Sequence, residues 1–476
     1  MKIAILGAGG VRTPLLAQAM AGRQARLGLT ELALMDIDAE RLELMSALAA
    51  SFDSDPHKPR VSAQDASMWR PERLQFKIVR TTDARVALAG ADFVITTFRV
   101  GGIAGRVIDE RVPLSHGVLG QETTGPGGFA MAMRTIPVLL DYLALMRELC
   151  PDAWLINFAN PAGLLAEAAM TAGGWQRTVG ICDAPASMAR VAAALLGVAY
   201  DEIYLDYFGL NHLGWIRAVL QNGRDHLPQF LAMIRQAGGL PGLPFDGEFI
   251  ADLGLIPNEY LFYYYHAAAA VANILRGGQT RGEQIAAANE RLFADLRRLQ
   301  PVGQVANLPH TALAIYHAYL GHRGETYMAG ETGGGHAQAG LAPQLLEALA
   351  GEGYAGVALD LIEGLVGARP RQMILNLPNR GALQGMAADA VVEIPAYVGK
   401  GLVWPCAVGA IPGHALGLMQ QVKAYEQLTI AAATEGSYRK AVAALTIHPL
   451  VRDNALAKAI VDEYRERHGA LFPALV

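Results

Sequence analysis

Short aliphatic segments alternate with helical patterns through the first half of the chain, and this alternation limits the possible fold more than any other feature. Nearly continuous apolar character, typical of strands buried on both faces, marks five segments: Lys2–Leu6, Glu31–Met35, Phe93–Thr97, Trp154–Phe158 and Thr178–Cys182. Helical patterns lie between them, at Thr13–Met20, Ala39–Ser51 and Arg134–Leu149. This order predicts an α/β fold with a Rossmann-like, doubly wound parallel sheet.

The pattern changes near residue 200, where Gly- and Pro-rich connections begin to separate the elements. We therefore predict one domain over residues 1–200 and an α+β domain over 201–476. Helices are expected at Leu255–Ile274, Leu341–Ala350, Ala415–Glu435, Tyr438–Leu445 and Asn454–Arg467, with a strand at Val391–Ile394. Loops are expected at Gly238–Gly247 and Gly330–Gly340.

Charge and cysteine content point to a small-molecule ligand in a reducing compartment. A net charge of −5 gives no electrostatic reason to expect a nucleic acid or an anionic membrane as partner. Three scattered cysteines do not form a disulfide framework. Met1 runs directly into a strand, which does not resemble a signal peptide, and the uncharged run Gly401–Val422 is broken by prolines and glycines and predicts a buried loop and strand. We expect a cytoplasmic protein.

A glycine-rich turn follows the first strand and is suited to a dinucleotide. Gly7, Gly9, Gly10 and Val11 lead into a helix, so backbone N–H groups and the helix N-terminus can face a pyrophosphate. The second strand ends at Asp36, which can bind a ribose hydroxyl and would repel a 2′-phosphate. The turn therefore favours NAD over NADP. An ordinary tight turn between strand and helix remains the alternative, because Arg12 stands at the position of the usual third glycine.

Two further segments carry side chains that can hold a divalent metal. Cys182 and Asp183 end a predicted strand, at the edge where a parallel sheet presents its ligands, and Asn211-His212 follows thirty positions later. A thiolate and an imidazole are good ligands for such an ion. Each also has a structural alternative: Cys182 and His212 as core residues, and Asp183 as the N-cap of the next helix.

Several short motifs, in one order along the chain, resemble the NAD- and manganese-dependent family 4 glycoside hydrolases, many of which act on 6-phosphoglycosides. The resemblance includes the loop Gln121–Gly128, Asn160-Pro161, Cys182-Asp183-Ala184-Pro185, Gly209–His212, Ile256–Tyr260, Glu393–Tyr397 and Ile447–Leu450. It implies an architecture like that of lactate and malate dehydrogenases, and a homodimer or homotetramer.

The resemblance also implies roles for individual residues. Cys182 and His212 would ligate Mn²⁺ or another divalent metal, Tyr260 would be the catalytic base and Asp183 the general acid. Substrate and its phosphate would be held by Asn160, Arg106 and Arg281, while Arg99 is a candidate for either cofactor or substrate. For Arg99 and Arg281 a surface ion pair is the alternative. Tyr264, four residues beyond Tyr260, is the alternative base.

The implied mechanism is an elimination made possible by temporary oxidation. A hydrogen on C2 of a pyranose is too weakly acidic for any side chain to remove, so hydride transfer from C3 to NAD⁺ must come first. Tyr260, with an ordinary pKa of about 10, would then take the C2 proton with help from the metal. The C1 substituent leaves, water adds, and the hydride returns to C3.

The sequence leaves the anomeric preference open. The loop Gln121–Gly125 resembles the 6-phospho-β-glucosidase branch, whereas Asp183 after the cysteine resembles the 6-phospho-α-glucosidase branch. The overall similarity favours the β-anomer. Hydrolysis of unphosphorylated glycosides or uronides, a plain hydroxyacid or sugar dehydrogenase, and a non-enzymatic NAD sensor also remain as alternatives.

Overall fold

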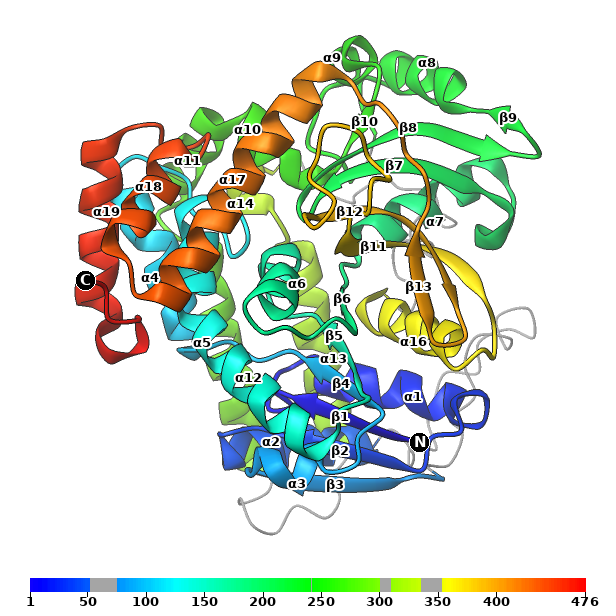
Figure 1. Ribbon diagram of the computed structural model, residues 1–476, viewed down its shortest axis with the longest axis vertical. Helices are drawn as coiled ribbons and strands as arrows, with labels where there is room; N and C mark the ends of the chain where they lie inside the picture. The colour runs from blue at the N-terminus through cyan, green and yellow to red at the C-terminus, as the bar shows by residue number, and fades with distance from the viewer. Residues whose placement is uncertain (52–74, 241, 300–309, 335–352) are drawn as a thin grey trace.

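The computed structural model describes residues 1–51, 75–240, 242–299, 310–334 and 353–476 (Figure 1). Six parallel strands lie in the order β3-β2-β1-β4-β5-β6. Their bounds are β1 Lys2–Leu6, β2 Glu31–Met35, β3 Lys77–Thr81, β4 Phe93–Thr96, β5 Trp154–Asn157 and β6 Thr178–Gly180. This is the Rossmann order, with the reversal between β1 and β4. The predicted sheet is confirmed, although β3 was not predicted and β4, β5 and β6 end one or two residues early.

Three strands from the second half of the chain extend the same sheet. They are β11 Arg371–Pro378, β12 Val391–Gly399 and β13 Leu402–Pro405, and they bring the sheet to nine strands. β11 runs antiparallel to β6, so the added strands continue the sheet beyond its parallel part. The division at residue 200 stays a prediction, and one continuous sheet crosses it.

Helices connect the parallel strands as the alternation predicts. Their bounds are α1 Thr13–Leu27, α2 Ala39–Ser51, α3 Ala84–Leu88, α4 Gly102–Ser115, α5 Gly125–Leu149, α6 Ala162–Thr171 and α7 Ala184–Leu196. α5 begins nine residues before the predicted start at Arg134, because Gly125–Gly128 continues it at its N-terminal end. α5 is the one described helix long and apolar enough to cross a membrane, but 61% of its most apolar window is buried in the interior.

A second, smaller sheet was not predicted. It consists of β7 Tyr204–Leu210, β8 Leu213–Gln221, β9 Arg224–Asp225 and β10 Ile256–Pro257. β7 and β8 form an antiparallel hairpin whose turn is Asn211-His212. In Figure 1 this hairpin lies at the opposite end of the molecule from β1–β3, above the end of β12. The predicted metal ligand His212 therefore sits in a tight hairpin turn.

The predicted continuous helix Leu255–Ile274 is wrong. Pro257 pairs with β8 as part of β10, and Asn258 accepts a hydrogen bond from the Tyr260 N–H, which starts a new helical turn. The segment is divided into η3 Glu259–Leu261, α10 Phe262–Tyr265 and α11 Ala267–Gly277. Proline cannot donate a backbone hydrogen bond and Asn is a strong N-cap, so the break is local in origin.

Other helices cover the second half of the chain. Their bounds are η2 Tyr200–Glu202, α8 Leu227–Ala237, α9 Gly247–Leu253, α12 Arg281–Leu299, α13 His310–Glu325, α14 Ala329–Thr332 and α16 Gly353–Leu365. The predicted helix Leu341–Ala350 lies outside the described residues, as does most of the predicted loop Gly330–Gly340, whose first residues belong to α14. The predicted loop Gly238–Gly247 is confirmed up to the start of α9 among its described residues.

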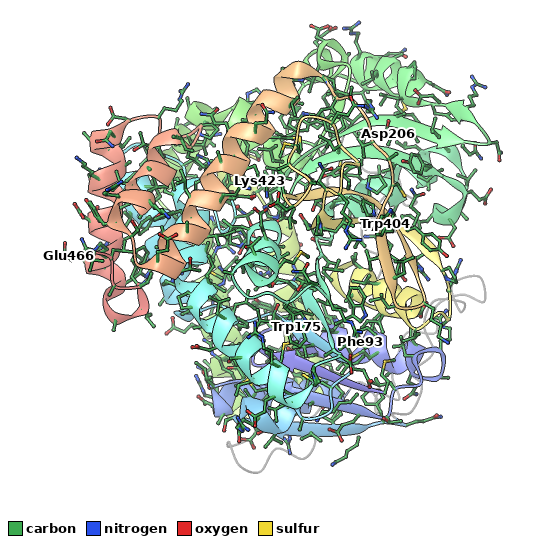
Figure 2. All side chains as sticks on the ribbon, in the orientation of Figure 1. Phe93, Trp175, Asp206, Trp404, Lys423 and Glu466 are labelled. Carbon is green, nitrogen blue, oxygen red and sulfur yellow. The ribbon has the colours of Figure 1, made fainter. Side chains whose placement is uncertain are left out.

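The C-terminal helices are close to prediction. They are α17 Gly413–Glu435, α18 Tyr438–Ile447 and α19 Asn454–His468, followed by η4 Gly469–Leu471. The uncharged run 401–422 was predicted as loop and strand, but its second half is helical because α17 starts directly after Pro412. Lys423 of α17 lies near the middle of the molecule (Figure 2) and forms buried ion pairs with Glu167 of α6 and with Glu426.

Candidate active site

The glycine turn after β1 is built closely against its neighbours. Gly7 has a φ of 99°, and a Cβ there would lie 2.4 Å from the backbone nitrogen of Phe98. A Cβ on Gly9 would lie 2.9 Å from the Asp36 carboxylate. Gly10 donates its N–H to the Gly7 carbonyl at 3.2 Å. A side chain at Gly7 would therefore clash with the backbone of Phe98, and one at Gly9 would displace the Asp36 carboxylate.

Asp36 lies beside this turn, as predicted. Its carboxylate accepts hydrogen bonds from the N–H groups of Gly9, at 2.7 Å, and of Asp38, at 3.0 Å. The helix α1 starts beyond the turn with Pro14 in its first positions, and no described side chain caps its N-terminus. A glycine turn, a helix N-terminus and a carboxylate at the end of the second strand fit a dinucleotide, although the N–H groups of Gly7, Ala8, Gly9 and Gly10 donate within the protein.

Val11 and Arg99 flank the turn on two sides. The Val11 carbonyl accepts a hydrogen bond from the Tyr316 hydroxyl of α13 at 2.7 Å, which holds the turn against the second half of the chain. Arg99, three residues beyond β4, donates to Glu122 at 2.5 Å. It therefore faces the loop before α5, and its ion pair with Glu122 is partly buried, with side chains 24% and 18% exposed.

His212 occupies the hairpin turn between β7 and β8 with a φ of 61° and is 3% exposed. Its ring stacks on the ring of Tyr260, with centroids 3.5 Å apart and planes 6° apart. Burial, opposed by the carboxylate of Glu122 and assisted by the charge of Arg106, lowers the pKa of His212 to about 3. Its Nδ1 atom is buried without a hydrogen-bond partner among the described residues. A neutral imidazole with an unused buried nitrogen fits a metal ligand.

Cys182 lies two residues beyond β6 and is 8% exposed. Burial raises the pKa of its thiol well above the ordinary value, and the nearby carboxylates of Glu393 and Asp183 add to this effect. Asp183 precedes α7, but its side chain makes no capping hydrogen bond. The carboxylate of Asp183 is therefore not used by the helix, contrary to the structural alternative.

Tyr260 is the common neighbour of these residues. Its ring contacts His212, and the charges of Cys182 and Asp183 act on its hydroxyl, whose pKa burial raises well above 10. Within the described ranges no group of three or more His, Cys, Asp or Glu side chains is arranged around one point as metal ligands. The imidazole and the thiol are thus two donors, and an ion here would take its remaining ligands from water or substrate oxygens.

Tyr327, which no sequence motif marked as functional, contacts the predicted base. Its hydroxyl donates to the Tyr260 hydroxyl at 2.5 Å and lies 3.5 Å from the carboxylate of Glu259. Burial raises the pKa of Glu259 to about 7. The alternative base Tyr264 lies elsewhere, with its ring 6.2 Å from that of His448. The geometry favours Tyr260 over Tyr264.

A buried carboxylate, Glu393 of β12, supports the hairpin turn. It accepts hydrogen bonds from the Tyr207 hydroxyl at 2.7 Å, from Asn376 at 2.9 Å and from Asn211 at 3.3 Å. Burial raises the pKa of Glu393 to about 7. The sequence showed Glu393 only as part of a motif and gave it no role. Its position next to Asn211 indicates that it fixes the residue preceding His212.

The predicted sugar-binding residue Asn160 lies close to the same turn. Asn160 and Pro161 are joined by a cis peptide bond, directly before α6. The backbone N–H of Ala162 donates to the side-chain oxygen of Asn211 at 3.1 Å. The segment of Asn160 and the hairpin of His212 are therefore hydrogen-bonded to each other.

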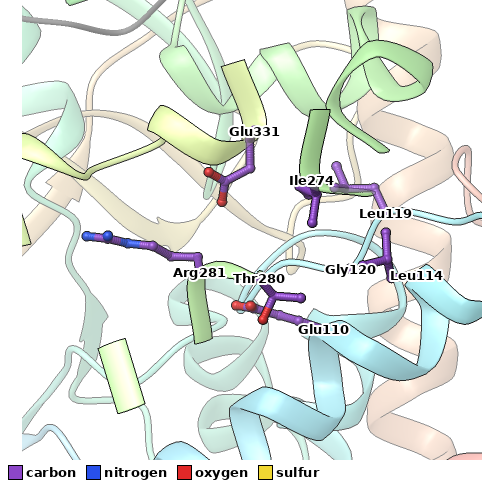
Figure 3. Close-up of a pocket in the computed structure, with 8 residues that line it drawn as sticks. All are labelled: Glu110, Leu114, Leu119, Gly120, Ile274, Thr280, Arg281 and Glu331. Atoms are coloured by element: carbon purple, nitrogen blue, oxygen red, sulfur yellow. The ribbon is translucent and has the colours of Figure 1, made fainter. Parts of the chain in front are cut away.

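The predicted phosphate-binding arginines differ in their partners. Arg106 is 4% exposed and lies between Glu110, at 2.7 Å, and Glu122, at 2.6 Å. Arg281, at the start of α12, points away from Glu110 and the apolar residues of a small pocket (Figure 3). Burial lowers the pKa of Arg281, and so does the charge of Arg106, so the two arginines lie near each other.

Two family models match the chain. One, described as family 4 glycosyl hydrolase, matches residues 2–198, and one, described as the family 4 glycosyl hydrolase C-terminal domain, matches residues 207–451. A probable 6-phospho-beta-glucosidase of Bacillus subtilis is 31% identical over 484 residues, covering 99% of this chain and 97% of the relative. The phospho-alpha-glucosidase PagL of Clostridium acetobutylicum is 28% identical over 482 residues, covering 98% and 97%.

Solved structures are similar over the full chain. The 6-phospho-beta glucosidase of Thermotoga maritima with NAD and glucose-6-phosphate has a TM-score of 0.81 and 27% identity, with 100% of each chain covered. A 6-phospho-alpha-glucosidase from gut microorganisms with NAD and Mn²⁺ has a TM-score of 0.79 and 26% identity, covering 100% of this chain and 99% of the other. The similarity thus extends to both anomeric specificities.

Proposed function

The chain belongs to family 4 of the glycosyl hydrolases, and from this premise we propose that it hydrolyses 6-phosphoglucosides with NAD and a divalent metal, preferably Mn²⁺. The observation that carries the proposal is the buried, unpartnered Nδ1 of His212, stacked on Tyr260 beside Cys182. The Bacillus subtilis relative is named a probable 6-phospho-beta-glucosidase, and one structure of the Thermotoga maritima 6-phospho-beta glucosidase contains manganese, NAD⁺ and glucose-6-phosphate.

The residues of this chain fit both cofactors. Gly7, Gly9, Gly10 and Asp36 would hold NAD at the edge of β1 and β2, and Cys182 and His212 would hold the metal. When bound, NAD supplies a reversible hydride acceptor and the metal supplies a Lewis acid. Such chemistry is needed because a pyranose C–H bond is not acidic by itself.

Tyr260 and Asp183 would move the protons. The Tyr260 hydroxyl, held by the hydroxyl of Tyr327, is the base we assign to the proton on C2. Asp183, whose carboxylate caps no helix, would protonate the departing glycosidic oxygen. The sugar and its phosphate would be bound by Asn160, Arg106 and Arg281. Arg99 would help to hold the loop Gln121–Gly128 through its ion pair with Glu122.

A β-linked substrate is our choice between the two anomers. Among the relatives, the 6-phospho-beta-glucosidase at 31% identity supports the β-anomer, whereas PagL, at 28%, is named for the α-anomer. Because the elimination begins with loss of the C2 proton, either anomer can react and Asp183 does not decide between them. Separate assays with the α- and β-anomers of p-nitrophenyl 6-phosphoglucoside would decide between them. Faster release of nitrophenol from the α-anomer would reverse this choice.

The decisive experiment uses purified protein with NAD⁺, Mn²⁺ and p-nitrophenyl 6-phospho-β-glucoside. We expect nitrophenol release without stoichiometric NADH, and loss of activity on chelation. Steady accumulation of NADH would instead indicate a dehydrogenase, and no turnover with intact NAD⁺ binding would indicate a sensor. In D₂O the product should carry deuterium at C2, since elimination exchanges that proton; its absence would exclude the elimination route.

The assembly and location of the protein are part of the same proposal. We propose a homodimer or homotetramer in the cytoplasm, where sugar phosphates and NAD are available. Light scattering of the purified protein measures the oligomeric state, and fractionation of the native cells measures the location. A monomer in solution would contradict the proposed assembly without affecting the assigned chemistry.

A further inference from the structure

Two arginines from different helices line a small pocket between α12 and α13. Arg281 begins α12 and Arg323 lies in the last turn of α13. The same pocket is lined by Tyr319, His322 and Thr326. Arg281 was selected from the sequence, whereas Arg323 was not. The two cations therefore face a common space whose other walls are mostly polar.

Both guanidinium groups are held in place by neutral oxygens. Arg281 donates to the carbonyl oxygens of Arg323, at 2.7 Å, and Thr326, at 3.0 Å, and to the Thr326 hydroxyl at 2.7 Å. Arg323 donates through Nη1 to the Tyr319 hydroxyl at 2.9 Å, and that hydroxyl donates to Asn289 at 2.7 Å. Arg281 thus closes the C-terminal end of α13, and Tyr319 orients Arg323.

No carboxylate forms an ion pair with Arg281 or Arg323 in the described part of the chain, which sets them apart from the arginines nearby. Arg106 pairs with Glu110 and Glu122, Arg99 pairs with Glu122, and Arg111 pairs with Glu283. Burial lowers the pKa of Arg323, and the charges of Arg12 and Arg106 lower it further. Both arginines are partly buried, and a partly buried cation without a counter-ion is costly, so such a pair is typical of a site for an anionic ligand.

We propose that Arg323 is a phosphate-binding residue that acts together with Arg281 in this pocket. This inference rests on the proposed function, which provides two phosphates: the 6-phosphate of the sugar and the pyrophosphate of NAD. Arg281 lies near Tyr327 and Glu122 on the side of the catalytic tyrosine, whereas Arg323 lies near Arg12 beside the glycine turn. A planar guanidinium held by Tyr319 is suited to bind phosphate oxygens through two N–H groups.

The experiment compares Arg323→Gln with Arg298→Gln in the full-length protein. Arg298 is a matched control, because it lies on α12 but is 78% exposed and, among the described residues, forms its ion pair with Asp295. Dissociation constants are measured by calorimetry for NAD⁺, and, with NAD⁺ and Mn²⁺ present, for glucose 6-phosphate and for glucose. We expect Arg323→Gln to weaken one phosphate-bearing ligand by about 10- to 100-fold, as for the loss of hydrogen bonds from a charged group.

The two sources of phosphate give different results. Weaker binding of glucose 6-phosphate with unchanged binding of glucose assigns Arg323 to the sugar phosphate, and weaker binding of NAD⁺ assigns it to the cofactor. Unchanged affinity for both ligands overturns the inference. If Arg323→Gln does not fold, Tyr319→Phe removes the hydroxyl that orients Arg323, and unchanged affinities in that variant overturn it equally. Failure of the wild-type protein to bind either ligand would instead refute the proposed function.

Discussion

The glycine turn and the His212–Tyr260 centre are two parts of one proposed active site, but they are built differently. The turn lies within one continuous segment, and Asp36, at its edge, already accepts two backbone hydrogen bonds. At the centre, Cys182, His212 and Tyr260 come from separate segments, and a buried nitrogen of His212 has no partner in the described residues. The turn thus satisfies its hydrogen bonds within the described residues, whereas the centre keeps a buried nitrogen that is not hydrogen-bonded there. Substitutions at the centre should therefore have the larger effects.

Cys182→Ser should have the largest effect, because it removes one of the two donors that we propose for the metal. We expect hydrolysis to fall to background and Mn²⁺ affinity to fall by more than the roughly 100-fold typical of residues outside the ligand shell. Electron paramagnetic resonance measures free Mn²⁺. A calorimetric titration should give an unchanged dissociation constant for NAD⁺, because the glycine turn is not altered. Normal Mn²⁺ affinity in this variant would place the metal elsewhere.

Tyr260→Phe tests the centre without touching a metal donor. Loss of a general base typically slows a reaction by about 10²- to 10⁴-fold, and we expect a decrease in kcat of that order. NAD⁺ and Mn²⁺ should bind as before. Tyr264→Phe is the matched control, since its ring lies near His448 instead of His212. If Tyr264→Phe were the slower variant, the assignment of the base would be wrong.

Glu393→Gln tests whether the centre needs support from outside its ligands. The amide keeps one acceptor for Asn211 and Asn376 but removes the negative charge beside Tyr207. We expect Mn²⁺ affinity to fall by about 10- to 100-fold, as for other residues that orient metal ligands. Glu363→Gln is the control, because Glu363 is equally buried but pairs with Arg23 and Arg371 far from the centre. Equal losses in both variants would indicate a general effect on stability.

The contrast between the two regions also explains what the sequence could predict. Aliphatic strands and the glycine turn are local patterns, so the parallel sheet and the residues Gly7–Asp36 were predicted correctly in position. The β7–β8 hairpin was missed because Gly, Asn and polar residues interrupt its alternation. Tyr327 and Glu393 were missed as functional residues because their contacts join distant segments: the Tyr207–Glu393 hydrogen bond spans 186 residues. No local spacing contains such information.

Asp36→Asn should have a smaller effect, confined to the turn. The Asp36 carboxylate accepts hydrogen bonds from the N–H groups of Gly9 and Asp38, and in the variant the amide oxygen can still accept one of them. Loss of the charge should weaken NAD⁺ binding by about tenfold and reduce the discrimination against NADP⁺ by a similar factor. Calorimetric titrations with both cofactors measure this. Mn²⁺ affinity in the presence of saturating NAD⁺ should not change, and a parallel loss would show that the two regions are not separable.

The smallest effect concerns stability away from both regions and defines the background for every assay at low pH. His448 is fully buried, burial lowers its pKa to about 3, and its Nδ1 accepts the Leu450 N–H at 3.1 Å. The folded protein keeps this imidazole neutral, whereas the unfolded chain protonates it near pH 6.5. The contribution of neutral His448 to the free energy of unfolding is therefore present above pH 6.5 and is lost as the pH falls towards 3. At pH 5 the loss is roughly 2 kcal/mol. Calorimetric melting of the metal-free protein should show a Tm a few degrees lower at pH 5 than at pH 7. In His448→Asn the amide oxygen can accept the same N–H, and the decrease in Tm between pH 7 and pH 5 should be smaller. An identical decrease in that variant would assign the titration to other groups.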